Sequence, residues 1–374
     1  MPQQLPAIQP PTSPRASRGM IWVAILSIVL ILGWTVPSQM VIERPGPVVD
    51  TLGEIELDGE ATPVISIDGV QTHPTDGELN LLTVSINGSP ENQLGWLSLL
   101  PVLFDPSQTA KPISEVFPEG VTSEDRNEQN KLMMEKSQAD ATASALRALG
   151  IDFTARVVIQ DVVADLPADG LLQPGDEILS VAGAPITGAG GLRAALADAG
   201  AGTPVTLGIL RDDEQRDVTA TPEQPKGATA PILGITVSAE YEFPVDVTMH
   251  LDRIGGPSAG LMFALGIGDE LTEESLTGGH IISGTGTIDD TGRVGAIGGL
   301  PQKMWGASRV GTELFLMPLG NCAQVPATVP GDMIVAPVAT LDEALQAIDD
   351  LNAGRVPAGL ERCPIESSGD ARLG

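Results

Sequence analysis

The chain has 374 residues, 42% of them hydrophobic, which is enough for two or three domains with a sizeable core. Its 49 acidic and 20 basic residues give a net charge of −29 at pH 7. Because a strongly acidic surface repels phosphates, we expect no nucleic-acid partner.

An apolar segment near the N-terminus predicts a transmembrane helix over residues 20–36, preceded by a disordered cytoplasmic head over residues 1–19. The segment MIWVAILSIVLILGWTV carries no charge and has Trp22 and Trp34 near its two ends, where indoles favour the membrane interface. Arginines precede it and acidic residues predominate after it, so the positive-inside rule predicts an extracytoplasmic location for the rest of the chain. A cleaved signal peptide is the alternative, although no A-x-A cleavage site follows the segment.

The next two segments differ in their hydrophobic pattern. Residues 37–125 contain short alternating or apolar runs between Gly, Asp and Asn turns, which predicts a β-rich segment and a connection. In residues 126–149 apolar side chains recur at intervals of three and four, which predicts a helix with Gly150 as its C-terminal cap.

Residues 126–224 are expected to hold this helix and a PDZ domain. The stretch GLLQPGDEILSVAG, residues 170–183, resembles the core of PDZ domains and precedes a predicted helix at about 188–199. PDZ domains bind an extended peptide as an added strand and hold its carboxylate in a loop of backbone N–H groups. The resemblance implies a peptide ligand and places that loop at Leu149, Gly150 and Ile151. A PDZ fold used only for packing is the alternative.

One serine in a glycine-rich stretch, Ser258 of RIGGPSAGLMFAL, is a candidate nucleophile. Its surroundings match the G-x-S-x-G nucleophile elbow of α/β-hydrolases, so an esterase is one hypothesis. That fold needs an acid and then a histidine later in the chain, and only His280 follows the serine. A histidine base is therefore disfavoured.

The residues around Ser258 suit acyl transfer. Gly256 lets a substrate approach the backbone closely, and Pro257 fixes the turn. The N–H of Ser258 or Ala259, at the start of the following helix, is the expected donor to an oxyanion.

An amine can replace the histidine as the base, and Lys303 is the last of only five lysines in the chain. A lysine in apolar surroundings loses its proton readily, because burial disfavours the ammonium. The neutral amine could then accept the Ser258 proton. The hydroxyl of Thr285, in ISGTGTID, could accept a hydrogen bond from the amine and orient it.

The stretch GGPSAG, followed by the lysine of GAIGGLPQK, resembles the proteolytic domain of Lon proteases over about residues 230–350, so a Lon-type proteolytic domain is expected over residues 225–352. The resemblance implies that Ser258 is the nucleophile, Lys303 the general base and Thr285 the hydroxyl that orients the lysine. The order of anchor, β-rich segment, PDZ domain and Lon-type domain is similar to that of the membrane-anchored PDZ–Lon serine proteases of bacteria. One departure is Gly255, which stands where Lon proteases typically have an acidic residue.

The resemblance implies a multidomain α/β and β protein with an N-terminal transmembrane helix, a β-rich segment, a PDZ domain and an α+β Lon-type proteolytic domain. No G-x-x-x-x-G-K-[ST] motif occurs, so we expect ATP-independent cleavage of exported or membrane polypeptides, without cofactor or metal. A ring-shaped homo-oligomer is expected by analogy. A non-catalytic PDZ scaffold is the alternative function.

The only two cysteines, Cys322 and Cys363, are a candidate disulfide. An extracytoplasmic compartment permits such a bond, and it would hold the C-terminal tail, residues 353–374. Two unrelated thiols are the alternative.

Overall fold

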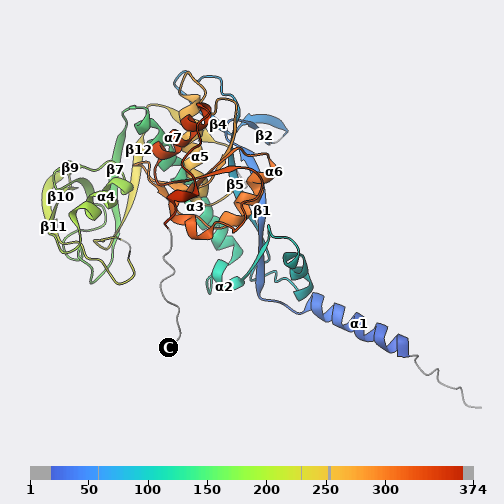
Figure 1. The fold of residues 1–374 in the computed structure, drawn as a ribbon. Coiled ribbons are helices and arrows are strands. Elements are labelled where there is room, and N and C mark those ends of the chain that lie inside the picture. Colours follow the sequence, from blue (N-terminus) through green and yellow to red (C-terminus); the bar gives the residue numbers. More distant parts are fainter. Residues whose placement is uncertain (1–17, 58, 229, 252–253, 365–374) are drawn as a thin grey trace, which may run out of the picture. The chain divides into compact units, whose positions relative to one another are not determined.

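The computed structural model describes residues 18–57, 59–228, 230–251 and 254–364. The chain divides into two compact units, one formed by Met1–Glu43 with Ile86–Ser123 and the other by Arg44–Ser85 with Glu124–Gly374. Figure 1 shows the elements of both units along the chain.

The first unit is dominated by apolar helical segments. The helix α1 (Arg18–Thr35) precedes β1 (Met40–Asp50), whose first residues pair antiparallel with β6 (Thr109–Pro112). Between these strands a 3₁₀ helix, Trp96–Leu103, packs against α1 at Gly33, where an added Cβ would meet the Leu97 side chain at 2.9 Å. The short helix α2 (Ile113–Val116) follows β6.

None of the helices in the described part of the chain combines the length and the hydropathy needed to cross a membrane. The structure therefore does not support the transmembrane helix that the sequence predicts over residues 20–36. The 18 residues of α1 extend for about 27 Å, close to the thickness of a hydrocarbon core of about 30 Å.

The second unit contains a mixed sheet with the order β18-β17-β14-β5-β1. The pairs β5–β14, β14–β17 and β17–β18 are parallel. Besides β1, this sheet contains the strands β5 (Glu78–Asn87), β14 (Ile281–Gly284), β17 (Leu314–Pro318) and β18 (Ile334–Val338). The apolar run LFLMP of β17 is buried along its whole length, and such runs are typical of strands covered on both faces.

Helices cover both faces of this sheet. Because successive side chains of a strand point to opposite faces, each face has its own apolar cluster. Along β17, Leu314 and Leu316 belong to one apolar cluster, and Phe315 and Met317 belong to another. The first cluster contains the helices α3 (Ser123–Ala148), α5 (Gly260–Glu270) and α7 (Leu341–Asn352), and the second contains α6 (Leu300–Arg309).

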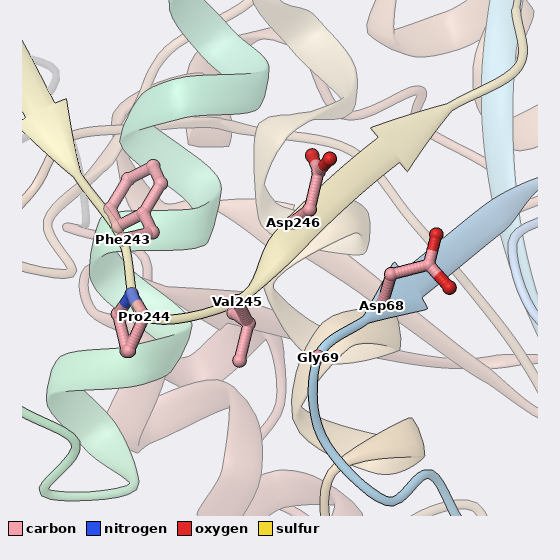
Figure 2. A pocket seen from close by; sticks show the side chains of 6 residues that line it. All are labelled: Asp68, Gly69, Phe243, Pro244, Val245 and Asp246. Carbon is pink, nitrogen blue, oxygen red and sulfur yellow. The ribbon is translucent and has the colours of Figure 1, made fainter.

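Three small antiparallel pairs surround this core. They are β2 (Glu54–Leu57) with β3 (Glu60–Pro63), β4 (Ile65–Asp68) with β13 (Asp246–Met249), and β15 (Thr287–Ile288) with β16 (Val294–Gly295). An open pocket lies where β4 and β13 meet, and Asp68 and Asp246, which are cross-strand partners, line it (Figure 2). The pocket contains none of the predicted catalytic residues.

The PDZ domain also belongs to the second unit and is an antiparallel sheet with the order β11-β10-β8-β7-β12. Its elements are β7 (Thr154–Val162), β8 (Glu177–Val181), β9 (Ala184–Pro185), α4 (Ala189–Ala199), β10 (Val205–Arg211), β11 (Glu214–Ala220) and β12 (Ile235–Glu242). Its own apolar cluster joins Leu192 and Leu196 of α4 to the inward side chains of the strands.

The structure moves two of the predicted domain boundaries. β12 completes the PDZ sheet beside β7, although the sequence places it in the Lon-type domain that begins at residue 225. In the predicted β-rich segment, β1 and β5 are strands of the mixed sheet that also contains β14, β17 and β18, and β4 pairs with β13. Long-range pairing decides both cases, since an alternating strand carries no local signal of its partner.

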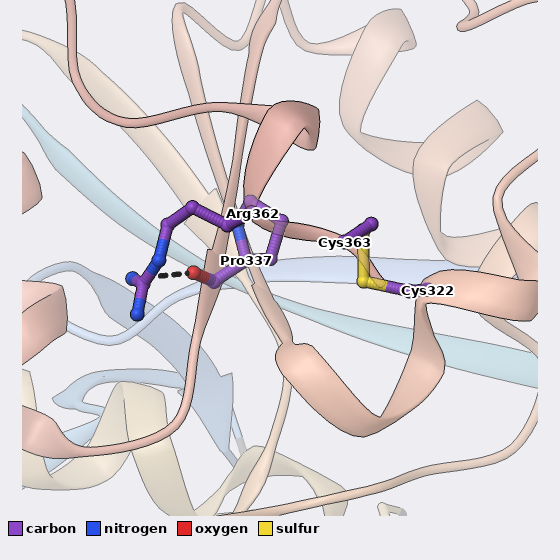
Figure 3. Close-up of a disulfide and its surroundings, with 4 residues drawn as sticks. All are labelled: Cys322, Pro337, Arg362 and Cys363. Atoms are coloured by element: carbon purple, nitrogen blue, oxygen red, sulfur yellow. Dashed lines mark hydrogen bonds between the residues drawn. A yellow bond between two sulfur atoms is a disulfide. The ribbon is translucent and has the colours of Figure 1, made fainter. Parts of the chain in front are cut away.

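Cys322 and Cys363 form a disulfide with a Cα–Cα distance of 5.5 Å (Figure 3). Cys322 lies in the 3₁₀ helix Leu319–Gln324 after β17, and Cys363 follows the 3₁₀ helix Leu360–Arg362. Beside it, the Arg362 guanidinium donates to the Pro337 carbonyl at 2.9 Å and pairs with Glu343 at 2.7 Å. Together these contacts fasten the C-terminal segment to β18 and α7.

A buried carboxylate at the end of α5 weakens the fold at neutral pH. Asp269 is 1% exposed, and its Oδ2 has no hydrogen-bond partner among the described residues. Burial, with smaller contributions from Asp50 and Asp76, raises the pKa of Asp269 to about 6, although the Leu276 N–H bond opposes the shift. Because the folded state holds this proton more tightly than the unfolded state, the stability falls as the pH rises from about 4 to about 6.

We expect Asp269→Asn to raise the free energy of unfolding by about 1–2 kcal/mol at pH 8 and to have little effect at pH 4. The amide retains the oxygen that accepts from Leu276 and removes the buried charge. Urea unfolding at both pH values measures the difference, with the exposed Asp246→Asn as the matched control. An equal gain at both pH values would contradict the electrostatic explanation.

Candidate active site

The loop before α5 positions Ser258 at the start of a buried helix. Gly256 has φ +90°, a conformation that favours glycine, and Pro257–Ala259 forms a 3₁₀ turn that continues into α5. The first turn of a helix has N–H groups without acceptors inside the helix, so the N–H groups of Ser258 and Ala259 can serve an oxyanion.

The helix α3 holds this loop from the other side. The N–H of Gly256 donates to the Asn130 carbonyl at 3.0 Å, and the Ser137 hydroxyl donates to the Pro257 carbonyl at 3.0 Å. Sequence reasoning missed Asn130 and Ser137. Ser137 is one of several buried polar residues of α3, so nothing in the local pattern marks it, and its partner lies 120 positions away.

The amine of Lys303 lies against the serine. Its Nζ donates to Ser258 Oγ at 2.7 Å and to Thr285 Oγ1 at 2.8 Å. Lys303 lies in the first turn of α6 and is only 2% exposed. This burial lowers the pKa of its ammonium from 10.5 to about 7, so a large fraction of the amine is neutral near pH 7.

Thr285 follows the last residue of β14 and joins the two other residues. Its hydroxyl accepts from Lys303 and donates to the Ser258 carbonyl at 3.0 Å. The N–H of Gly286 donates to the same carbonyl at 2.9 Å. The backbone of the serine is therefore fixed by two donors from the link between β14 and β15, which also carries the hydroxyl that orients the lysine.

We expect Thr285→Val to lower kcat for casein by about 10–100-fold with little change in KM, because it removes the acceptor that orients Lys303. Thr285→Ser, which retains the hydroxyl, is the control and should stay within about threefold of the parent. Equal losses in the two variants would show that the methyl packing of Thr285, and not its hydroxyl, matters.

The histidine that an esterase mechanism requires lies elsewhere. His280 precedes the first residue of β14, and its Nδ1 contacts Glu313 at 2.9 Å. Thr285 follows the other end of this strand, so the imidazole and the dyad are roughly 15 Å apart along the chain direction. Within the described residues, no three His, Cys, Asp or Glu side chains converge as metal ligands.

The structure does not place Leu149, Gly150 and Ile151 at an open sheet edge. They follow α3, where Gly150 has φ +70° and Ile151 packs against the protease core. The strand after them, β7, lies between β8 and β12 and has no free side for a peptide. Of the two edge strands of this sheet, β12 lies beside α4, because Ile235 and Val237 pack on the cluster that contains Leu192.

Comparisons with known families agree with this architecture. Residues 124–221 match the model of the PDZ domain, and residues 246–349 match that of the Lon protease (S16) C-terminal proteolytic domain. The chain thus combines a PDZ domain with a proteolytic domain of the Lon-type serine peptidases.

Similar proteins include a Lon protease of Campylobacter concisus, 39% identical over 24% of this chain and 12% of the relative. A Lon protease 2 of Herpetosiphon aurantiacus is 33% identical over 39% of this chain and 18% of the relative. The chain thus spans less than a fifth of the length of these two relatives. Among solved structures, the PDZ domain of an SdrC-like protein from Listeria innocua is 20% identical, covering 22% of this chain and 92% of that one, with a TM-score of 0.21.

Proposed function

We propose that this chain is an ATP-independent serine endopeptidase in which Ser258 and Lys303 form a catalytic dyad. The observation that carries the proposal is the buried amine of Lys303, 2.7 Å from the Ser258 hydroxyl, with its pKa lowered to about 7. A neutral amine at this distance is within reach of the proton it must accept.

In the proposed reaction the Ser258 hydroxyl attacks the carbonyl carbon of a peptide bond, and Lys303 accepts the hydroxyl proton. The N–H groups at the start of α5 stabilise the oxyanion. Lys303 then donates the proton to the leaving amine. In the second half of the reaction, Lys303 accepts a proton from the water that attacks the acyl-enzyme and donates it to Ser258 Oγ as the acyl bond breaks. Thr285 keeps the amine in place through both steps.

The PDZ domain is proposed to bind an extended peptide along the free edge of β12. This edge has unpaired backbone groups on one side and lies next to α4, so an added strand would pack between them. The turn before β12 contains Gly234, with φ +80°, in the sequence PILGI. We place the peptide carboxylate at this turn, and not at Leu149, Gly150 and Ile151.

We further propose that the protein works at a membrane, outside the cytoplasm, on exported or membrane polypeptides. Large apolar side chains are exposed along α1, with Trp22 and Trp34 near its ends, and a helix apolar on all sides suits a lipid environment. The disulfide Cys322–Cys363 is of the kind that persists in oxidising compartments.

Cleavage of casein by the full chain, without ATP, tests the proposed activity. We expect the parent to produce peptides and Ser258→Ala to be inactive, while His250→Ala and His280→Ala retain activity. Loss of activity in a histidine variant, with ester hydrolysis preferred over peptide hydrolysis, would instead support an esterase. A parent that binds peptides without cleaving any substrate would support a PDZ scaffold.

A further inference from the structure

The PDZ helix α4 lacks an N-terminal cap from its own chain segment. Gly188 precedes the helix and has no side chain to accept a hydrogen bond. The N–H of Gly190, in the first turn, instead donates to Asp290 Oδ1 at 2.7 Å. Asp290 belongs to the protease, in the turn between β15 and β16, and is completely buried. A carboxylate at this position accepts a hydrogen bond from a free N–H group, and the positive end of the helix dipole stabilises its negative charge.

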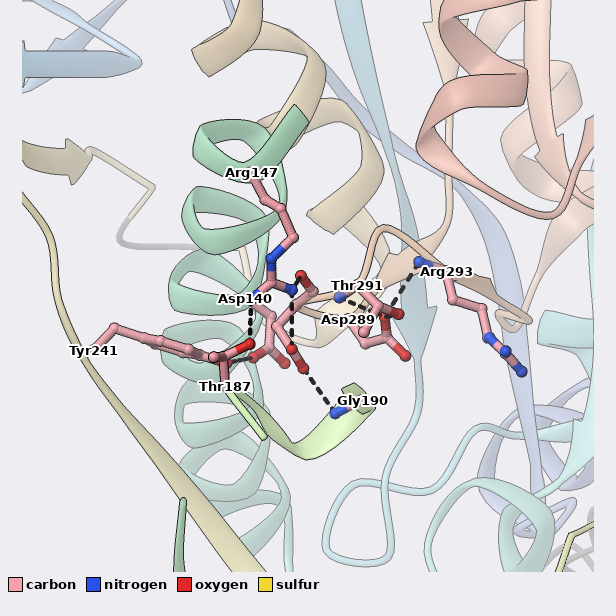
Figure 4. Close-up of polar contacts among 9 residues, drawn as sticks. Asp140, Arg147, Thr187, Gly190, Tyr241, Asp289, Thr291 and Arg293 are labelled. Atoms are coloured by element: carbon pink, nitrogen blue, oxygen red, sulfur yellow. Dashed lines mark hydrogen bonds and ion pairs between the residues drawn. The ribbon is translucent and has the colours of Figure 1, made fainter. Parts of the chain in front are cut away.

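Arg147 completes this contact from α3. Its guanidinium pairs with Asp290 Oδ2 at 3.2 Å, donates to the Asp290 carbonyl, and donates to Thr187 Oγ1 at 2.7 Å. Figure 4 shows Arg147 of α3, Thr187 from the PDZ segment before α4, and Gly190 from the first turn of α4 converging on this contact. The contact therefore joins three elements through one buried carboxylate.

The glycines of the PDZ segment make room for this carboxylate. A Cβ on Gly188 would lie 2.1 Å from Asp290 Cγ, and one on Gly190 would lie 2.6 Å from Asp289 Cγ and 2.8 Å from Asp290 Oδ1. Gly188 has φ 170°, which any residue can adopt, so space and not backbone conformation requires glycine there. At Gly191 the nearest atom to an added Cβ is 3.9 Å away.

The turn that carries Asp290 is rigid and leads directly to the dyad. Asp289 Oδ1 accepts from Thr291 Oγ1 at 2.6 Å and from the N–H groups of Thr291 and Arg293. β15 ends directly before this turn, and immediately before β15 lie Thr285 and Gly286, which hold the Ser258 carbonyl.

The other wall of the proposed peptide groove is held in a similar way. Tyr241, near the end of β12, donates to Asp140 Oδ1 at 3.0 Å, and Asp140 lies one helical turn from Ser137 on α3. Ser137 in turn holds the Pro257 carbonyl. Both the helix and the strand beside the groove thus contact segments that fix the serine loop.

We infer that Asp290 is a positioning residue through which the PDZ helix α4 holds β15 and the link before it, which carries Thr285 against Ser258, so that the PDZ domain sets the activity of the dyad. This inference rests on the proposed peptidase function. The inference goes beyond substrate capture by the PDZ domain, because capture alone would require no contact between α4 and the turn that follows β15. A peptide that moves α4 would act on Ser258 through the same carboxylate.

The test changes only the PDZ side of the contact in the full chain and measures casein cleavage. Gly188→Ala displaces the Asp290 carboxylate, and we expect kcat to fall by about tenfold with KM within about twofold of the parent. Gly191→Ala, three residues further on and without a clash, is the matched control and should retain the parent kcat. Loss of substrate capture would raise KM instead.

A double-mutant cycle separates positioning from general damage. Asp290→Ala removes the carboxylate that Gly188→Ala displaces, so the double variant should lose no more kcat than the worse single variant. Thermal unfolding identifies variants that fail to fold, and Gly188→Ala remains informative if Asp290→Ala is one of them. Parent-like kcat in folded Gly188→Ala, or full additivity in the cycle, would overturn the inference while leaving the peptidase intact. A parent without cleavage would overturn both.

Discussion

Replacing Lys303 by methionine is expected to lower casein cleavage by at least about 10³-fold, because the dyad loses its base. In the parent, cleavage should fall about tenfold per pH unit below about pH 7 and reach a plateau above it. The reason is that burial lowers the pKa of Lys303 to about 7, and only the neutral amine can accept the Ser258 proton. A pH–rate profile of kcat/KM measures this limb.

The same substitution should stabilise the fold at neutral pH. The unfolded chain binds the Lys303 proton up to about pH 10.5 and the folded chain only up to about pH 7, so the stability of the parent falls as the pH is lowered between these values. Methionine has a similar length and no charge, so it avoids the cost of burying an ammonium. The resulting gain in stability is reduced because methionine cannot make the two hydrogen bonds of the amine. We expect a net increase of about 1–3 kcal/mol in the free energy of unfolding at pH 7.

Urea unfolding at pH 7 and at pH 10 checks this second effect, which should shrink at the higher pH. Lys226→Met, at an exposed position between β11 and β12, is the matched control and should change neither cleavage nor stability. A destabilised Lys303→Met would mean that the hydrogen bonds of the amine outweigh the cost of its burial. Retained cleavage in that variant would falsify the dyad.

Removing the disulfide by Cys322→Ser with Cys363→Ser is expected to lower the free energy of unfolding by about 3–4 kcal/mol. The bond joins residues 41 positions apart, and its loss returns conformational entropy to the unfolded chain. The closed loop contains β18 and α7, so the protease sheet loses stability at its edge. Ser258, Thr285 and Lys303 all lie outside this loop, so kcat should change little in conditions where the variant is folded.

Urea unfolding with and without reducing agent measures the effect. The parent should fall to the stability of the double variant when reduced, and the double variant should not respond to the reductant. A parent that is insensitive to reduction would contradict the stabilising role of the bond. The single hydrogen bond and ion pair of Arg362 would then be sufficient to hold the C-terminal segment.

Short motifs were enough to predict that Ser258 and Lys303 lie together. Ser258 and Lys303 are each embedded in glycine-rich stretches whose local conformation follows from their own residues, and the shortage of histidines and lysines narrowed the choice of base. The same holds for the PDZ core at residues 170–183, where the turn residues and the alternating strand are contiguous.

Contacts between distant segments decided the rest. The parallel pairing of β5 with β14 joins strands that lie far apart in the chain, and neither strand specifies its partner through its own pattern. The assignment of β12 to the PDZ sheet depended in the same way on its register with β7. For Asp290, an acidic pair followed by threonine and glycine predicts only a turn. Its cap on α4 exists because folding buries that turn against two PDZ glycines, and burial turns an ordinary surface carboxylate into a partner for a helix N-terminus.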